Sequence, residues 1–324
     1  MASEHATISN VKWQRGYKFD RQTELYSNMS VGKGPPKYLH DVVETSMRKR
    51  AVEWHIPDCG LSAALRFSVV LNDDSRIFVK ASTDDETEQW LRNEYLLLSS
   101  INTQFTPDVI AWIDTPEIRP VLICQDLSHA YWPATNAGVS WRNGDFDLLF
   151  DALRNISSTK PPNGLPEMQN RKQSLWSKIA RNPEPFLNLK LCSEHWLAKS
   201  IDTLIHAESK LDVTGTCLVH NDIRSDNICI LGNQIKFVDW SHAAIGSGSH
   251  DLATLLPNLH LEGGPLPYEI RPDGGSEAAS QSSAHILRLI SQPSMPEWLK
   301  TVFKKIIAIE LDWATSCLDL EKAE

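Results

Sequence analysis

Four polar residues in the second half of the chain have the types and spacing that phosphoryl transfer to a hydroxyl requires. They are His220, Asp222, Asn227 and Asp239. Such a reaction needs one carboxylate that orients or accepts the hydroxyl proton, and oxygen ligands that hold magnesium against the phosphates. Carboxylate and amide oxygens are the hard ligands that Mg²⁺ prefers. The set therefore predicts Asp222 as the catalytic residue and Asn227 with Asp239 as magnesium ligands.

Short strands are expected to position these side chains. Apolar runs at residues 217–219, 228–231 and 235–238 alternate with the polar positions, and Gly-Asn-Gln at 232–234 marks a turn. A loop held between such strands can bring its polar side chains to one point. Because His220 directly follows a strand, we expect it to bond to the backbone around the loop rather than act as an acid or base.

The spacing His-x-Asp-x₄-Asn, followed by a strand-borne Asp, is that of the protein-kinase catalytic loop. Segments 218–228 (LVHNDIRSDNI) and 238–240 (VDW), with Gly246 and 251–253 (DLA), resemble the aminoglycoside phosphotransferase-like family of small-molecule kinases. The resemblance follows the order of elements over roughly residues 55–320 and is specific over roughly residues 217–256. The run from 251 to 265 is similar to a bacterial subgroup whose members mostly have no assigned substrate.

This resemblance implies an α+β, two-lobed protein-kinase-like fold, with a β-rich N-lobe and a mainly helical C-lobe that carries a short β insert. It implies transfer of the γ-phosphoryl group of MgATP to a small-molecule hydroxyl, with ATP and Mg²⁺ as cofactors. The backbone around Gln125 and Leu127 would bind adenine, and the loop with Gly60 and Ser62 would approach the phosphates. Asp251 would buttress the catalytic loop from below.

The first half of the chain offers the remaining parts of a nucleotide site. A hairpin is expected from strands at 65–71 and 76–80 around the turn Asn-Asp-Asp-Ser. Lys80 ends the second strand, and Glu94 lies between Leu91 and Leu98 on the apolar side of the next helix. A carboxylate on a buried stripe is costly unless it is paired. We therefore predict that Glu94 holds Lys80 against the α- and β-phosphates.

A second glutamate and a capping motif belong to the same predicted helix. Glu88 stands four residues before Arg92 and is expected to form a surface pair with it. Residues 83–86, Thr-Asp-Asp-Glu, fit a capping box that opens the helix. Further strands are expected at 109–113 and 121–124. The periodicity predicts later helices at 145–156, 193–211 and 296–320, and the Ser/Gly/Ala-rich patch 273–284 is expected to be a loop that enters a helix.

Three positions depart from the pattern of the family. Asn221 stands where the family usually has Gly, and no Glu occurs near Gln125 and Asp126, where one is usual. Arg224 lies inside the catalytic loop. It either neutralises a transferring phosphate or an acidic substrate, or forms a structural ion pair with Asp226 or Glu262.

Composition limits the partners. The 41 acidic and 32 basic residues give a net charge of −9, which disfavours a sequence-independent grip on nucleic acid and is compatible with a cationic acceptor such as an aminoglycoside. No apolar run reaches about 18 residues and the first residues are polar, so we expect no membrane span and no signal segment. The six cysteines show no zinc or Cys-x-x-Cys spacing, which favours a reducing, cytoplasmic location.

Three domains are predicted along the chain: an N-terminal extension at 1–50, a nucleotide-binding N-lobe at 51–125, and a catalytic and substrate-binding C-lobe at 126–324. The extension holds nine basic and five acidic residues. It is expected to be a partly ordered extension, a strand and helix on the surface of the next domain, or a tether.

Other functions remain open at this stage. One is a non-catalytic nucleotide-binding protein on the same fold. Another is a metallohydrolase that uses His220, Asp222, Asp239, His242, His250 and Asp251. A protein kinase is disfavoured, because no Ala-Pro-Glu follows Asp239. The acceptor, the choice between ATP and GTP, the C-lobe acids that contact substrate and the oligomeric state are not determined by the sequence.

Overall fold

A computed structural model of the chain describes residues 35–57, 63–135 and 138–323. These residues form two compact units. The sheet unit comprises residues 35–166 and 220–244, and the helical unit comprises residues 167–219 and 245–323. The chain therefore enters the sheet unit twice, and the second entry brings in the predicted catalytic loop. The predicted domain boundaries at residues 50 and 125 stay a prediction.

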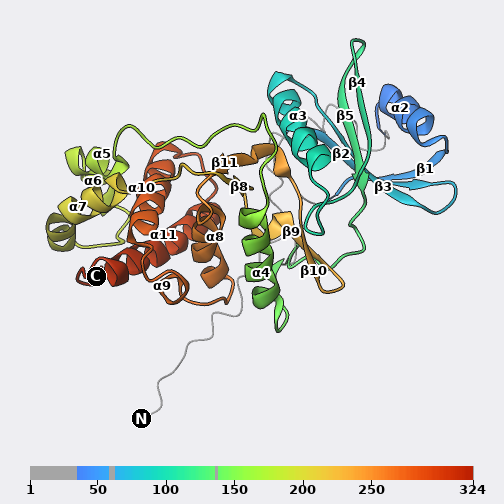
Figure 1. The fold of residues 1–324 in the computed structure, drawn as a ribbon. Coiled ribbons are helices and arrows are strands. Elements are labelled where there is room, and N and C mark those ends of the chain that lie inside the picture. The colour runs from blue at the N-terminus through green and yellow to red at the C-terminus, as the bar shows by residue number, and fades with distance from the viewer. Residues whose placement is uncertain (1–34, 58–62, 136–137, 324) are drawn as a thin grey trace. The chain divides into compact units, whose positions relative to one another are not determined.

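The sheet unit is built on an antiparallel sheet with strand order β1-β2-β3-β5-β4 (Figure 1). Its strands are β1 Ala51–His55, β2 Leu65–Leu71, β3 Arg76–Ala81, β4 Val109–Thr115 and β5 Ile118–Gln125. The predicted hairpin is confirmed, and its register sets Phe67 opposite Val79 and Arg66 opposite Lys80. This register decides which side chains share a face of the sheet.

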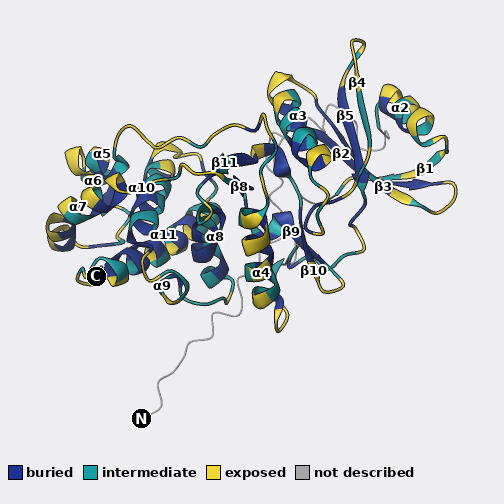
Figure 2. Cartoon of the chain, viewed as in Figure 1, coloured by how far each residue is buried: buried dark blue, intermediate teal, exposed yellow. Residues whose placement is uncertain are grey.

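Alternation along the strands divides the sheet into an apolar and a polar face. Leu65, Phe67, Val69 and Leu71 of β2 form one buried cluster with Ile77, Val79, Ala81, Val121 and Ile123, and Leu39 and Val43 of helix α2 (Lys37–Met47) cover it. Figure 2 shows strands β2, β3 and β5 as largely buried. The described end of the predicted extension is therefore a helix that packs on the sheet.

Helix α3, Asp85–Ser100, lies on the opposite face of the sheet. Its N-cap is Asp84, whose side chain accepts from the Thr87 backbone N–H, while the Thr87 hydroxyl oxygen accepts from the Asp84 backbone N–H. The predicted capping box at 83–86 was wrong by one residue, because the shorter threonine reaches back in place of Glu86. The helix buries Leu91, Glu94 and Leu98, as its periodicity predicted.

The rest of the sheet unit carries the predicted catalytic loop. Strands β9 (Ile228–Leu231) and β10 (Gln234–Phe237) form an antiparallel hairpin, with the 3₁₀ turns η1 (Ser225–Asn227) before it and η2 (Trp240–His242) after it. The remaining elements are β6 Ala134–Thr135, β7 Gly138–Val139 and α4 Asp145–Ser158. The β insert predicted from short apolar runs is thus present.

The described residues of the helical unit form seven helices and two short strands, the second of which begins at Ala244, the last residue of the sheet unit. They are α5 Leu175–Arg181, α6 Glu184–Leu187, α7 Glu194–Ser209, β8 Cys217–Val219, β11 Ala244–Gly246, α8 His250–Leu261, α9 Pro267–Ile270, α10 Gly275–Ser291 and α11 Glu297–Cys317. Five of the six cysteines lie in the described ranges, and all five are free thiols. Within those ranges no helix has the length and apolarity needed to cross a bilayer.

The patch 273–284 was expected to be a loop that enters a helix. The helix is present, but it begins earlier than expected, because α10 starts at Gly275. Small residues allow close packing there, and Ala278, Ala279, Ser282 and Ser283 are buried. The Ser282 hydroxyl donates to the Ala278 carbonyl oxygen of the preceding turn at 2.8 Å, which satisfies it inside the helix. Packing between helices overrides the weak helix propensity of serine and glycine. Such packing cannot be read from the local sequence pattern.

Candidate active site

Lys80 and Glu94 form a buried ion pair on the polar face of the sheet. The Lys80 Nζ lies 2.5 Å from a Glu94 carboxylate oxygen, and the two residues are only 6% and 5% exposed. On strand β3, Lys80 points away from the apolar cluster that α2 covers. Glu94 lies on the buried side of α3 and faces Lys80. The predicted pairing of these side chains is confirmed.

Asp239, which lies 159 residues after Lys80 in the sequence, also contacts the Lys80 ammonium group. Its Oδ1 accepts from Lys80 Nζ at 2.7 Å and from the Ser241 hydroxyl at 2.6 Å. Burial alone would raise the pKa of Asp239, but the positive charges of Lys80 and Arg66 outweigh it and hold that pKa well below its usual range. Burial would lower the pKa of Lys80, and the charges of Asp239 and Glu94 raise it. Both partners are therefore ionised.

Helix α3 is also tied to the segment that follows Asp239. Asn93 Nδ2 donates to the carbonyl oxygens of Ser241 at 2.8 Å and Ala243 at 3.0 Å. The rings of Trp90 and His242 pack edge to face with centroids 5.3 Å apart. The residue next to Glu94 thus fixes the helix against η2, which sets how Glu94 and Asp239 approach Lys80.

His220 is a buried structural residue of the predicted catalytic loop. It is fully buried, its Nε2 lies 3.1 Å from the Val238 carbonyl oxygen, and its Nδ1 accepts from the Asp222 backbone N–H at 3.3 Å. Burial lowers its pKa to about 4, so the ring is neutral near pH 7. The expectation that His220 bonds to the backbone around the loop is confirmed.

The Asp222 carboxylate is held from two sides. Arg224 Nη1 lies 3.3 Å from Oδ1, and Asn227 Nδ2 lies 3.3 Å from Oδ2 and 2.9 Å from the Asp222 carbonyl oxygen. Burial raises the pKa of Asp222, while the charge of Arg224 lowers it. Arg224 also pairs with both oxygens of Asp226, at 2.9 and 3.1 Å. The predicted Arg224–Asp226 ion pair is therefore present.

Two residues of the site adopt the left-handed backbone conformation. Asn221 has φ 63° and Asp239 has φ 64°. Glycine is unstrained there, and asparagine and aspartate are the other residues that visit this region readily. Asn221 can therefore adopt this backbone conformation at little cost.

The segment predicted to meet adenine follows β5. Asp126 is buried, accepting from the Ser68 hydroxyl at 2.5 Å and from the Ser128 backbone N–H at 3.0 Å. The Leu127 carbonyl oxygen accepts from Trp132 Nε1 at 3.0 Å. By strand alternation Gln125 shares the face of Ile123, so only its backbone can meet a ligand on the Lys80 face. Asp126 thus acts as a structural anchor.

The site prediction also includes Gly60, Ser62 and Asp251. Gly60 and Ser62 lie outside the described residues. Asp251 is buried in the first turn of α8, in the helical unit. Across the described ranges, no group of three or more His, Cys, Asp or Glu side chains is arranged to hold a metal ion.

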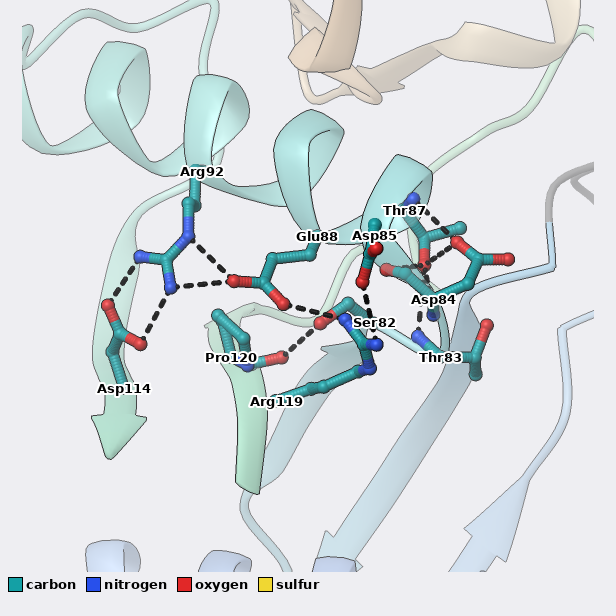
Figure 3. A network of polar contacts seen from close by, with 10 residues as sticks. All are labelled: Ser82, Thr83, Asp84, Asp85, Thr87, Glu88, Arg92, Asp114, Arg119 and Pro120. Carbon is teal, nitrogen blue, oxygen red and sulfur yellow. Dashed lines mark hydrogen bonds and ion pairs between the residues drawn. The ribbon is translucent and has the colours of Figure 1, made fainter. Parts of the chain in front are cut away.

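A surface network holds the first turns of α3 to strands β4 and β5 (Figure 3). Arg92 bridges Glu88 at 2.9 Å and Asp114 at 2.5 Å, and Arg119 bridges Asp85 and Glu88 at 2.8 Å each. The predicted Glu88–Arg92 pair is confirmed. Single exposed pairs contribute little, but a connected set of five side chains fixes the helix that carries Glu94.

Sequence reasoning missed several side chains of the polar face. Arg66, Ser68 and Phe78 share the face of Lys80 by register, and Ser241 lies 3.2 Å from Lys80 Nζ. Phe78 is half-buried and offers an aromatic surface next to Leu122 and Cys124. The hairpin turn at 72–75 fixes the register, and counting outward from it could have found Arg66, Ser68 and Phe78.

Comparison with solved structures shows the same fold. Spectinomycin phosphotransferase, APH(9)-Ia, in complex with ADP and spectinomycin has TM-score 0.55 and 14% identity over 86% of this chain and 98% of that chain. The GDP and kanamycin complex of APH(2")-IIia has TM-score 0.54 and 14% identity, over 85% and 98%. Macrolide 2'-phosphotransferase MphH from Brachybacterium faecium has TM-score 0.50 and 12% identity, over 88% and 99%. The predicted α+β protein-kinase-like fold is confirmed.

Sequence comparison gives the family. No curated protein matches the chain. The model of the phosphotransferase enzyme family matches residues 66–283, from strand β2 into helix α10 and more than half of the chain. The predicted membership is confirmed by this match. The chain belongs to the phosphotransferase enzyme family and is a small-molecule kinase.

Proposed function

We propose that the protein transfers the γ-phosphoryl group of MgATP to a hydroxyl of a small molecule. One observation carries the proposal: Lys80, Glu94 and Asp239 form a single ion-paired cluster, in the same unit as the Asp222 loop. A non-catalytic nucleotide-binding protein would have no use for a second carboxylate held in place by Arg224 and Asn227.

Each residue has a distinct role in the proposal. Asp222 accepts the hydrogen bond of the acceptor hydroxyl and takes up its proton as the hydroxyl oxygen bonds to the γ-phosphorus and the bond from that phosphorus to the departing ADP breaks. Lys80 neutralises the α- and β-phosphates, and Glu94 keeps the ammonium group in place. The Asp222 carboxylate suits its role because burial favours proton uptake, while two donors fix its orientation.

The donor set near the phosphates fits magnesium. Asn227 uses its Nδ2 as a donor to Asp222, so its Oδ1 is the atom that could ligate a metal. Asp239 accepts from Lys80 and Ser241 through Oδ1, which directs our proposal to Oδ2 as the metal ligand. Such hard oxygen ligands suit Mg²⁺, which when bound neutralises charge on the phosphates.

Replacing Asp239 by asparagine should abolish the magnesium-dependent part of nucleotide binding. For the unmodified protein, MgATP at about 100 times its Kd stabilises the fold by about 2.7 kcal/mol, which a thermal shift detects. Asparagine tolerates the left-handed backbone of residue 239 but lacks the carboxylate charge. We therefore expect the Asp239→Asn protein to give the same small shift with and without Mg²⁺.

Asp74→Asn is the matched control. Asp74 has the same φ of 64° but lies in the exposed β2–β3 turn, so its variant should keep the full MgATP shift. A magnesium-dependent shift that persists in the Asp239→Asn protein would contradict the assignment. If the unmodified protein binds a transition metal tightly and shows no shift with MgATP or MgGTP, a metallohydrolase is favoured instead.

Removing the charge of Arg224 should change the pH dependence of turnover. Burial raises the pKa of Asp222 and Arg224 lowers it, so Arg224→Met should raise that pKa further. Asp222 accepts a proton only when ionised, and activity is lost as pH falls through its pKa. The acid limb of kcat/KM should therefore move to higher pH in Arg224→Met, while Arg224→Lys should keep it close to its original place.

The same measurement separates the two roles that the sequence left open for Arg224. An acid limb at the same pH in Arg224→Met, together with a raised KM at every pH, would show that Arg224 binds phosphate or substrate instead. The profile is measured as kcat/KM against pH for both variants.

The acceptor is proposed only as a class. The net charge of −9 is compatible with a cationic hydroxyl compound of the aminoglycoside type. Thermal shifts with nucleotide plus aminoglycosides, choline-like amines, sugars and hydroxy amino acids, followed by turnover assays, would identify it. Phosphorylation of a neutral sugar alone would contradict a cationic acceptor but leave the phosphotransferase proposal intact.

A further inference from the structure

Ser241 is a buried serine whose hydroxyl group lies among the charged side chains of Lys80, Glu94 and Asp239. It is 6% exposed. The Ser241 Oγ donates to Asp239 Oδ1 at 2.6 Å and accepts from Lys80 Nζ at 3.2 Å. Lys80 Nζ itself lies 2.7 Å from the same Asp239 oxygen. The ammonium nitrogen, the hydroxyl oxygen and the carboxylate oxygen therefore form a closed triangle of hydrogen bonds.

The hydroxyl group of Ser241 has a single proton, so it can serve one acceptor at a time. Two carboxylate oxygens are close to it: Asp239 Oδ1 at 2.6 Å and Glu94 Oε2 at 3.4 Å. A hydrogen bond from a hydroxyl group to a carboxylate is normally about 2.5–2.7 Å long. The distances therefore assign the proton of Ser241 to Asp239.

Two donors thus meet on one oxygen of the Asp239 carboxylate. A carboxylate that is held by one donor can rotate about its Cβ–Cγ bond and exchange its two oxygens, whereas two donors from different directions keep Oδ1 in place. The ammonium group of Lys80 is a compact charge on a flexible stem, and it also serves Glu94 at 2.5 Å. Ser241 is therefore the group that fixes the orientation of the Asp239 carboxylate, with Oδ2 as the remaining oxygen.

Helix α3 holds the backbone on both sides of Ser241. Asn93 Nδ2 donates to the carbonyl oxygen of Ser241 at 2.8 Å and to that of Ala243 at 3.0 Å. Asn93 directly precedes Glu94, so two consecutive residues of one helix hold the partner of Lys80 and the serine that donates to Asp239. A continuous set of hydrogen bonds therefore connects Asn93 to the Asp239 carboxylate.

We propose that Ser241 is a positioning residue that orients the Asp239 carboxylate with Oδ2 toward the metal, and that Asn93 holds Ser241 in place. This inference rests on the proposed function, because it requires Asp239 as a magnesium ligand. Groups that hydrogen-bond to a metal-ligating side chain change metal affinity by about 10-fold to 100-fold when they are removed. Lys80 and Glu94 are not altered by such a change, so the binding of ATP without magnesium should be retained.

The test measures the affinity of the full-length protein for ATP with and without magnesium. Isothermal titration gives the Kd for ATP in EDTA and in saturating Mg²⁺, and the ratio of the two Kd values is the gain in affinity from the metal. For Ser241→Ala we expect this gain to fall by about 10-fold to 100-fold, while the Kd in EDTA stays the same. Asn93→Ala, which removes the support of Ser241, should also reduce the gain.

Two controls separate the loss of this hydrogen bond from the effect of a cavity. Ser241→Cys nearly keeps the volume of the side chain but offers only a weak S–H donor, so it should lose the magnesium gain as Ser241→Ala does. Ser82→Ala is the matched control. Ser82 is 2% exposed, lies in the same unit, and donates through its hydroxyl group to the Pro120 carbonyl oxygen at 3.1 Å (Figure 3). Its replacement should leave both Kd values unchanged.

The other outcomes overturn the inference in distinguishable ways. Equal losses of ATP affinity in EDTA and in magnesium for Ser241→Ala would assign Ser241 a general structural role. An undiminished gain in Ser241→Ala, or in Ser241→Cys, would show that the hydroxyl donor does not orient the metal ligand. If the Ser241 variants do not fold, an undiminished gain in Asn93→Ala overturns the proposal instead. An unmodified protein that binds ATP in neither condition would contradict the proposed function itself, before any variant is compared.

Discussion

Replacing Asp222 by asparagine is expected to lower kcat by about 10²-fold to 10⁴-fold, the usual contribution of a general base. Asparagine keeps the size of the side chain and an oxygen that can accept from Asn227, but it takes up no proton. The cluster of Lys80, Glu94 and Asp239 is not altered, so affinity for MgATP should be unchanged. Turnover and calorimetric titration with MgATP measure the two quantities.

Asp226→Asn is the control for this substitution. Asp226 lies in the same loop and pairs with the same arginine, Arg224. The Asp222 carboxylate in addition accepts a hydrogen bond from the Asn227 side chain. Its loss should reduce kcat far less than the loss of Asp222. An Asp222→Asn protein that turns over as fast as the original would remove Asp222 from the mechanism. Loss of MgATP affinity together with turnover would instead indicate collapse of the loop.

Replacing Lys80 by methionine is expected to lower the free energy of unfolding by about 3–5 kcal/mol and to abolish nucleotide binding. Both carboxylates that Lys80 contacts, at 2.5 and 2.7 Å, would be left without this cation, and the Glu94 side chain is only 7% exposed. Neutralising Glu94 at the same time should recover part of the loss, because no uncompensated buried charge then remains there. Chemical denaturation measures the stability of the single and double variants.

Lys236→Met is the matched control, because Lys236 is the other lysine that is buried among the described residues. It is 7% exposed and donates to the Thr106 carbonyl oxygen at 2.7 Å. Replacing Lys236 should lower the free energy of unfolding by about 1–3 kcal/mol, because one buried polar group then lacks its partner. The affinity for nucleotide should not change. If Lys80→Met/Glu94→Gln is no more stable than Lys80→Met, the ion pair is not the source of the loss.

Local features of the sequence were sufficient for the elements that carry the site. The turn at 72–75 between two β-rich runs predicted the β2–β3 hairpin, and apolar spacing predicted the helix that holds Glu94. Because an unpaired buried carboxylate is costly, the sequence also predicted that Glu94 pairs with Lys80. Each of these inferences depends on contacts between residues close in sequence, or on a rule with few exceptions.

Predictions failed where local signals compete. The N-cap of α3 is Asp84 rather than Thr83, since both residues are good caps and only the packed helix selects one. The patch at 273–284, expected to be a loop that enters a helix, is helical from Gly275 onward, because its buried alanines and serines let neighbouring helices approach closely. Propensity is a weak guide when packing of this kind decides the conformation.

The sequence by itself determined the chemical inventory: an Asp–Asn loop, a strand lysine, a helix glutamate and the hairpin that holds them. Only the tertiary structure decided how that inventory is combined. Lys80 and Asp239 meet across 159 residues of chain, and Asn93 and Ser241 across 148. The register of β2 against β3 places Arg66 opposite Lys80. Contacts of such long range depend on chain closure and on the packing of whole elements, which periodicity and turn signals do not encode.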